Sequence, residues 1–179
     1  MPNQKPLMLL RQLLKNSRKS DRELAKSLGF SQPTITRLRT KLEKERYIKT
    51  YTIIPDFTKL GYQILAFTFS KLKSYPTPED AIKIVEQATE WVNRYPNVIF
   101  ASDGEGLGGK DVIMISIHKD FIKYTNFMRK YALEWGHMIA TFETFLVSLG
   151  PGFKMKPLDL KYLADDKNEE TNEKRPIKH

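Results

Sequence analysis

The stretch from Ser20 to Arg46 constrains the fold of this chain most, because it predicts two short helices joined by a tight turn. Ser20 and Glu23 have the S-x-x-E spacing of a capping box, which favours a helix start. Gly29 marks the end of that helix, since glycine adopts the left-handed conformation without steric cost. Ser31 is a suitable cap for the second helix. Apolar residues at helical spacing predict one shared buried face: Leu24, Ala25, Leu28, Ile35, Leu38 and Leu42.

The outward face of the second predicted helix is basic and rich in hydroxyl groups. It consists of Pro33, Thr36, Arg37, Thr40, Lys41 and Lys44. Two helices joined by a short glycine turn, the second with such a face, are typical of a DNA-binding helix-turn-helix. The alternative is an ordinary helical hairpin with a solvated charged face. The distribution of charge along the chain helps to choose between the two.

Positive charge is concentrated in the first third of the chain. Residues 1–60 contain 14 Lys and Arg against 5 Asp and Glu, whereas residues 61–179 contain 16 of each class, so the first segment carries the whole net charge of +9. A localised basic surface attracts polyanions, which favours DNA binding over a merely solvated face. The predicted helices lack the Trp/Phe edge of a membrane-surface helix. No apolar run approaches the roughly 20 residues that span a bilayer.

The segments around the helix pair complete a winged helix-turn-helix domain. The run Tyr47–Pro55 is rich in β-branched and aromatic residues and predicts a strand, the wing. Residues 56–61 are interpreted as a linker or a hinge helix, and the change in charge balance places the domain boundary near residue 60. A first helix over residues 6–17 carries one apolar stripe, formed by Leu9, Leu10, Leu13 and Leu14.

A second domain is predicted over residues 61–150. Strands are expected over residues 62–72, 98–102, 111–118 and 138–149, with helices over 77–95 and 119–135. This β-α-β-β-α-β order is that of ferredoxin-like folds, so the fold class is α+β. In the first helix of this domain, the expected buried stripe is Ala81, Val85, Ala88 and Val92.

Two further predictions concern the first strand of the second domain and the residues that follow this domain. Leu65, Phe67 and Phe69 are expected on one face of the first strand, and we interpret the aromatic residues of the strands as core and subunit interface. Residues 151–179 form a C-terminal extension. Phe153–Leu163 is expected to pack back as a short extension, whereas residues 164–179 are too polar to bury a core and are expected to be disordered.

In this arrangement the chain resembles the Lrp/AsnC (feast/famine) transcriptional regulators over residues 7–150. The resemblance is carried by Glu23-Leu24-Ala25, Gly29-Phe30-Ser31, Leu42-Glu43, Ile48-Lys49-x-Tyr51 and Leu60-Gly61. It implies a cytoplasmic DNA-binding regulator whose C-terminal module forms homodimers, often assembled into octamers, and often binds an amino acid between subunits. The chain departs from the family pattern in the order of Leu38 and Arg39, in Arg46 where a glycine usually precedes the wing, and in a longer loop at Gly104–Asp111.

The start of a recognition helix enters the major groove, so its first residues are the predicted base contacts. These are Gln32, Thr34, Thr36 and Arg37. Arg37 suits guanine O6 and N7, Gln32 suits adenine, and Thr36 suits a thymine methyl group. Residues farther along are predicted to contact phosphates, namely Thr40, Lys41 and Lys44, joined from the wing by Lys49 and Tyr51. For the two wing residues, simple solvent exposure is the alternative.

The glycine-rich segment before Asp111 formally matches G-x-G-x-x-G, but it leads into a strand, whereas a dinucleotide fingerprint leads into a helix. It is interpreted as a flexible hairpin loop or, alternatively, as an effector-contacting loop in which Gly108, Gly109 and Asp111 bind an amino-acid-like ligand. The chain has no cysteine, and no histidine has a partner at metal-ligand spacing. No catalytic residue, metal or cofactor is predicted.

The leading hypothesis is therefore a sequence-specific, dimeric or larger DNA-binding transcriptional regulator that is not an enzyme. Two alternatives stay open. Some proteins similar to this family are sirohaem decarboxylases, which keep the helix-turn-helix but bind a tetrapyrrole between domains. The same basic face would also suit an architectural protein that coats DNA with little sequence preference.

Overall fold

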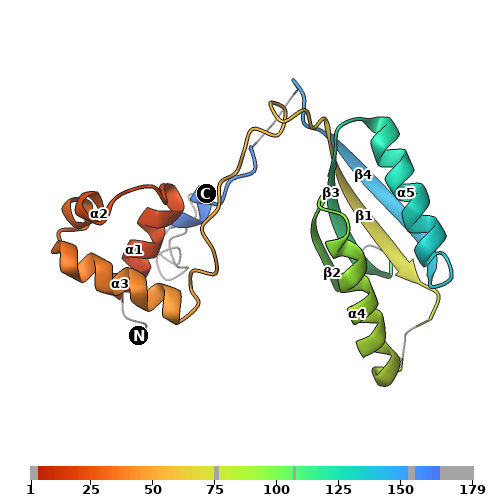
Figure 1. The fold of residues 1–179 in the computed structure, drawn as a ribbon, viewed down its shortest axis with the longest axis horizontal. Helices are drawn as coiled ribbons and strands as arrows, with labels where there is room; N and C mark the ends of the chain where they lie inside the picture. Colours follow the sequence, from red (N-terminus) through yellow and green to blue (C-terminus); the bar gives the residue numbers. More distant parts are fainter. Residues whose placement is uncertain (1–3, 75–76, 107, 153–155, 166–179) are drawn as a thin grey trace, which may run out of the picture. The chain divides into compact units, whose positions relative to one another are not determined.

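The computed structural model of the chain describes residues 4–74, 77–106, 108–152 and 156–165. These residues form two compact units (Figure 1). The first unit contains the residues up to Ile54 together with the described C-terminal residues, and the second begins at Pro55. The charge pattern predicts a domain boundary near residue 60. In the structure the boundary lies between Ile54 and Pro55, somewhat earlier in the chain.

Residues 57–61, expected to be a linker or a hinge helix, form consecutive turns. The Leu60 N–H donates to the Asp56 carbonyl at 3.3 Å, and the Gly61 N–H donates to the Thr58 carbonyl at 2.9 Å. Gly61 has φ 80°, a left-handed conformation that stops helical propagation. The segment therefore connects the units without adding a helix.

The first unit is built on three helices, α1 (Gln4–Lys15), α2 (Asp21–Leu28) and α3 (Gln32–Lys44). Both predicted helix starts are confirmed. The Ser20 hydroxyl accepts from the Glu23 N–H, and the Glu23 carboxylate accepts from the Ser20 N–H, which completes the capping box. Gly29 ends α2 with φ 70°. The core contains the predicted apolar residues, Leu9, Leu13, Leu24, Ala25, Ile35, Leu38 and Leu42.

The strand predicted at Tyr47–Pro55 is wrong for this chain. Residues 48–56 have no regular secondary structure, and no strand of the first unit's described residues lies beside them. A β-rich composition favours an extended backbone, but a strand also needs a partner whose N–H and C=O groups complete the ladder. The segment consequently leaves Ile53 78% exposed.

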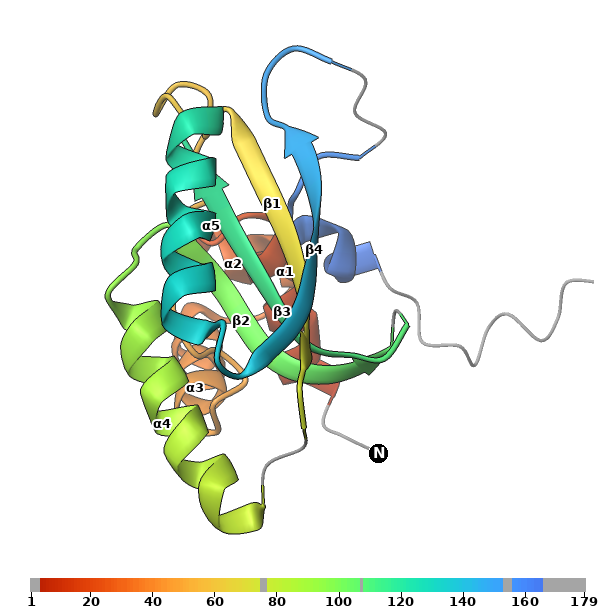
Figure 2. The same cartoon turned by 90° about the vertical axis from the view of Figure 1, so that its right-hand side faces the viewer.

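The second unit is the predicted four-stranded antiparallel sheet with two helices (Figure 2). Its elements are β1 (Ile64–Leu72), α4 (Pro78–Asn93), β2 (Val98–Gly106), β3 (Lys110–His118), α5 (Phe121–Trp135) and β4 (Ile139–Ser148). The strand order β2-β3-β1-β4 is that of a ferredoxin-like sheet, as the order of elements predicted. Neither these helices nor the others among the described residues are long and apolar enough to cross a membrane.

The two faces of β1 differ in an unexpected way. Leu65, Phe67 and Phe69 do share a face, but they are only half-buried, whereas the alternate residues are buried. The buried set is small or polar: Ala66, Thr68 and Ser70. Ser70 is hydrogen-bonded to the Tyr131 hydroxyl of α5 at 2.8 Å, so this set faces the helices. The aromatic face of β1 is consequently the one that the helices leave uncovered.

The buried stripe predicted for α4 is wrong in one position. Val85 is 62% exposed, and Trp91, which the prediction left out, is 2% exposed. The observed stripe runs through Ala81, Ile84, Ala88 and Trp91, which has equally regular helical spacing. The large indole ring buries far more apolar area than a valine, so it decides which face of α4 turns inward.

The C-terminal extension packs back as expected, but its packed residues continue past Leu163. Residues Lys161–Asp165 form a short helical turn, η1, which packs on α1. Ala164 is buried there, although the polar composition placed the start of disorder at this residue. The remainder of the predicted disordered tail, residues 166–179, lies outside the described residues.

Candidate nucleic-acid interface

The outward face of α3 forms a shallow concave surface. Its lining contains all six residues predicted for this face, together with Glu45: Pro33, Thr36, Arg37, Thr40, Lys41 and Lys44. On the opposite side of the helix, Ile35, Leu38 and Leu42 are buried in the core. Because hydrophobic burial fixes the rotation of α3, the basic residues are held toward solvent.

Two of the predicted base contacts already have hydrogen-bond partners. The hydroxyl groups of Thr34 and Ser31 lie 2.8 Å apart at the helix start. The Thr36 hydroxyl donates to Asp21 at 2.7 Å and is within 3.2 Å of the Gln32 carbonyl oxygen. Since its hydroxyl is occupied, Thr36 has its methyl group left for an apolar contact, as the prediction of a thymine methyl requires.

The other predicted residues of α3 are available to a ligand to different degrees. Lys41 forms an i,i+4 ion pair with Glu45 at 3.6 Å, which is weak because both side chains are exposed. Within the described part of the chain, no side-chain partner is recorded for Gln32, Arg37, Thr40 and Lys44. These four side chains can therefore meet DNA without breaking an intramolecular contact.

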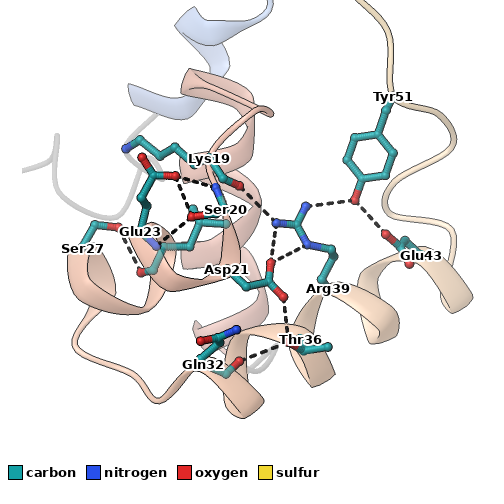
Figure 3. A network of polar contacts seen from close by, with 11 residues as sticks. Lys19, Ser20, Asp21, Glu23, Ser27, Gln32, Thr36, Arg39, Glu43 and Tyr51 are labelled. Carbon is teal, nitrogen blue, oxygen red and sulfur yellow. Dashed lines mark hydrogen bonds and ion pairs between the residues drawn. The ribbon is translucent and has the colours of Figure 1, made fainter.

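Arg39 is the polar centre of the first unit, and the sequence did not indicate this role (Figure 3). Its guanidinium donates to Asp21 Oδ1 from Nε at 3.0 Å and from Nη2 at 2.7 Å. It also donates from Nη1 to the Tyr51 hydroxyl at 3.4 Å. The Tyr51 hydroxyl in turn donates to Glu43 at 2.8 Å. The one feature of the sequence that relates to this role is the reversed order of Leu38 and Arg39, which turns the arginine toward α2.

This network changes the electrostatics of its members. The hydrogen bond from Thr36 holds the pKa of Asp21 below its usual value of 3.8. The hydrogen bonds and the positive charge of Arg39 act in the same direction. Partial burial raises the pKa of the Tyr51 phenol. Tyr51, predicted as a phosphate contact from the wing, is thus engaged within its own domain, whereas Lys49 is exposed.

The predicted effector residues lie at the β2–β3 turn, which is shorter than the glycine pattern indicated because β2 extends to Gly106 and β3 begins at Lys110. Gly108 and Gly109 have φ values of 69° and 74°, conformations that strongly favour glycine. Asp111 Oδ2 accepts a hydrogen bond from the Leu72 N–H at 2.7 Å, so this carboxylate also caps the end of β1.

Lys110, beside the predicted effector residues, has a structural role that its sequence position did not predict. Its side chain is 9% exposed and its ammonium donates to Glu143 at 2.8 Å and to the Thr141 hydroxyl at 3.2 Å, both on β4. The bond joins two strands that flank β1, a juxtaposition that only the sheet order creates. A buried lysine beside the turn therefore shapes the surroundings of the predicted effector residues.

Two of the histidines are placed by aromatic packing. His118 is buried, lies 2.9 Å from the Ser116 hydroxyl, and contacts the rings of Tyr124 and Phe127. Burial lowers the pKa of His118 below 6.5, which favours the neutral ring. His137 stacks on Trp135, and no group of three metal-ligating side chains occurs among the described residues.

Comparison with known proteins supports the helix-turn-helix assignment. The winged helix-turn-helix DNA-binding family matches residues 3–49. An uncharacterised helix-turn-helix transcriptional regulator of Pyrococcus abyssi is 37% identical over 100 residues, 52% of this chain and 66% of the relative. The regulatory protein AsnC of Haemophilus influenzae is 37% identical over 87 residues, 49% of this chain and 58% of that protein. The chain thus spans less than two thirds of each relative's length.

Solved structures match over a longer range. PH0061 of Pyrococcus horikoshii has a TM-score of 0.68 at 27% identity, with 87% of this chain and 99% of that structure covered. A transcriptional regulator of Neisseria meningitidis, solved as a complex with L-Met, has a TM-score of 0.72 over 91% of this chain and 99% of that one, at 17% identity. The second likeness concerns the fold alone.

A three-helix domain followed by a ferredoxin-like sheet domain is the architecture of this chain, and PH0061 matches it over 87% of the chain. The relatives named as helix-turn-helix regulators, AsnC among them, and the shared two-domain fold agree with the resemblance to the Lrp/AsnC regulators. The resemblance noted in the sequence is confirmed.

Proposed function

We propose that the protein is a sequence-specific DNA-binding transcriptional regulator that acts in the cytoplasm and is not an enzyme. The observation that carries this proposal is the outward face of α3, where Arg37 stands without an intramolecular partner among the described residues, beside Thr40 and Lys44. In this proposal Gln32, Thr34, Thr36 and Arg37 contact the bases. The phosphates are contacted by Thr40, Lys41, Lys44, Lys49 and Tyr51. Tyr51 can do so only after its hydrogen bond to Glu43 is broken.

We propose that the regulator is a homodimer formed through the sheet face that the helices leave uncovered. Phe145 is 68% exposed on β4, and its β1 partner Phe67 is half-buried on the same face. Register places apolar residues of all four strands there: Leu65, Phe67, Phe69, Phe100, Ile113, Ile115, Phe145 and Val147. Glu143, the β4 partner of Phe69, shares this otherwise apolar face. A large, mainly apolar sheet face of this kind marks an interface, and two-fold pairing is the commonest assembly.

Phe145→Glu tests this interface. A carboxylate buried against an apolar partner face is strongly unfavourable, so the variant is expected to sediment as a monomer or dissociate at much higher concentration. Phe121→Glu is the matched control, because Phe121 is 58% exposed on α5, on the helix side of the sheet. Equal assembly of wild type and Phe145→Glu would contradict the proposed interface.

We propose that an amino-acid-like effector contacts the β2–β3 turn at Gly108, Gly109 and Asp111. The left-handed glycines leave backbone groups approachable, and Asp111 keeps its second carboxylate oxygen free of a recorded partner. The L-Met complex of the Neisseria regulator, a protein of the same fold, supports this ligand class. The family resemblance also implies further assembly of dimers into octamers and binding of an amino acid between subunits.

Selection of bound fragments from genomic duplex DNA tests the main proposal. A specific regulator is expected to enrich a consensus of two half-sites related by two-fold symmetry, about one helical turn apart or a multiple of it. Enrichment without a consensus would instead support an architectural protein. Tight binding of sirohaem by a protein that ignores duplex DNA would support the enzyme alternative.

A further inference from the structure

A recess lies between the C-terminal ends of α4 and α5 in the second unit. Its volume is about 510 Å³, within the range of small-molecule sites. Residues that matter for its chemistry are Glu90, Trp91 and Arg94 of α4, with Glu134, Trp135 and His137 at the end of α5. Neither the predicted DNA contacts nor Gly108, Gly109 and Asp111 belong to it.

Trp91 gives the recess an unusual hydrogen-bond donor. Its side chain is 2% exposed, and its ring lies 4.6 Å from that of Tyr95 and 6.4 Å from that of Trp135. The indole N–H is the one buried side-chain polar group among the described residues without a hydrogen-bond partner. Since buried donors are almost always paired, this N–H indicates a missing acceptor.

The charges around the recess favour a cation. Glu134 is paired with Arg94 at 3.1 Å and accepts from the Tyr95 hydroxyl at 3.2 Å, whereas no partner of the Glu90 carboxylate is recorded within the described ranges. Both helices end here, and a helix C-terminus carries partial negative charge. At the end of α5 this charge is partly offset by Lys73, whose ammonium donates to the Gly136 carbonyl at 2.8 Å. The carboxylate of Glu90 and the end of α4 would therefore repel an anionic ligand.

Aromatic faces complete the site. The rings of Trp135 and His137 are nearly parallel, with 15° between their planes and 6.4 Å between their centroids. Tryptophan presents the most favourable aromatic face to an organic cation. We propose that the recess binds a small organic cation that carries a hydrogen-bond acceptor. The cation lies against Trp135 and Glu90, and the acceptor receives the Trp91 N–H.

Intrinsic fluorescence tests this proposal, because both tryptophans of the chain line the recess. Choline is the probe, since it combines a quaternary cation with a hydroxyl acceptor. The control ligand is 3,3-dimethylbutan-1-ol, which has the same shape and hydroxyl without the charge. At constant ionic strength, choline is expected to change the emission saturably, with an affinity about tenfold higher than that of the neutral alcohol.

Two variants locate the response. Glu90→Gln is expected to weaken choline binding about threefold to tenfold, whereas Glu86→Gln, an exposed change on the same helix outside the recess, leaves it unchanged. Trp91→Phe keeps a ring but removes the N–H, and Trp135 still reports binding. If Trp91→Phe does not fold, the two glutamate variants decide the matter.

No saturable response to choline, or an equal response to the neutral alcohol, would overturn the proposal. Equal effects of Glu90→Gln and Glu86→Gln would overturn it as well. The titration contains no DNA, so its outcome does not depend on the regulator function proposed above.

Discussion

At the scale of single residues, Arg46 stands where a glycine would be expected and has φ 59°, a left-handed conformation. It follows α3, and its N–H donates to the Glu43 carbonyl at 3.1 Å, as in a helix C-terminal cap. A residue with a β-carbon in this conformation destabilises the folded state by roughly 1–2 kcal/mol relative to glycine. Glycine offsets part of this advantage, because it has more conformational freedom in the unfolded chain.

Replacing this residue is therefore a direct test of the helix end. Arg46→Gly is expected to raise the free energy of unfolding by about 0.5–1 kcal/mol, measured by urea unfolding of the full chain. Arg46→Ala keeps the β-carbon and is the control. A destabilised Arg46→Gly protein would show that the arginine side chain makes a contribution that its conformation does not reveal.

Asp21 predicts a dependence of stability on pH. Its pKa is lower in the folded chain than the unfolded value of 3.8, chiefly through the Thr36 hydrogen bond and then Arg39. The unfolded state therefore binds the proton first as pH falls, so this stabilisation is complete above about pH 4 and is lost through the folded pKa.

Asp21→Asn is expected to lower stability at neutral pH by about 1–3 kcal/mol, because Arg39 loses a charged partner. It should also flatten the acid limb of the stability curve relative to wild type, as followed by chemical unfolding between pH 2 and 7. Glu86→Gln, an exposed change outside the network, should leave both unchanged. An acid limb of unaltered slope in Asp21→Asn would remove Asp21 from this account.

At the scale of elements, α3 combines two kinds of contact that mutation can separate. Arg37→Ala is expected to relax base preference at one position of the selected site, at a cost of about 1–3 kcal/mol for the preferred sequence. Lys44→Ala should weaken binding to all sequences alike and reduce the salt dependence of binding by about one unit. A uniform loss in Arg37→Ala would instead assign Arg37 to the phosphates.

The sequence predicted those elements whose causes are local. The Ser20 capping box, the Gly29 stop and the leucine periodicity each depend on residues within one or two helical turns, and the structure contains all of them. The wing strand failed because a strand requires a distant partner. The stripe of α4 failed because two helical spacings fit equally, and contacts of Trp91 with α5 decide between them.

In the candidate site, too, the features with local causes were predicted and those with distant partners were not. The basic face of α3 follows from helical periodicity and was predicted as a set. Arg39 and Lys110 were not predicted as structural residues, because their partners Asp21 and Glu143 are far away in sequence. Such long-range polar pairs form only when helices or strands pack against one another, so the local sequence does not reveal them.

At the scale of the whole molecule, the described C-terminal residues return to the first unit. The turn η1 packs on α1, Ala164 is 7% exposed there, and Lys15 pairs with Asp165 at 2.7 Å. The ion pair is largely exposed and contributes little, so apolar burial is the main attachment. In the chain, the sheet domain is thus preceded and followed by segments of the first unit.

Ala164→Glu is expected to detach this turn, because a charge in a buried position is unfavourable. Limited proteolysis should then cut the C-terminal segment faster than in wild type. Asp165→Asn removes only the exposed ion pair and should leave the cleavage rate nearly unchanged. Equal protection of wild type and Ala164→Glu would contradict docking through Ala164.

The central claim is that the α3 face recognises particular DNA sequences. The most direct measurement compares the affinity of the full chain for its best selected site with its affinity for mixed-sequence duplex at the same salt concentration. We expect the selected site to be bound at least about a thousandfold more tightly than the mixed-sequence duplex. Equal affinities for the two duplexes, with the same salt dependence, would contradict it.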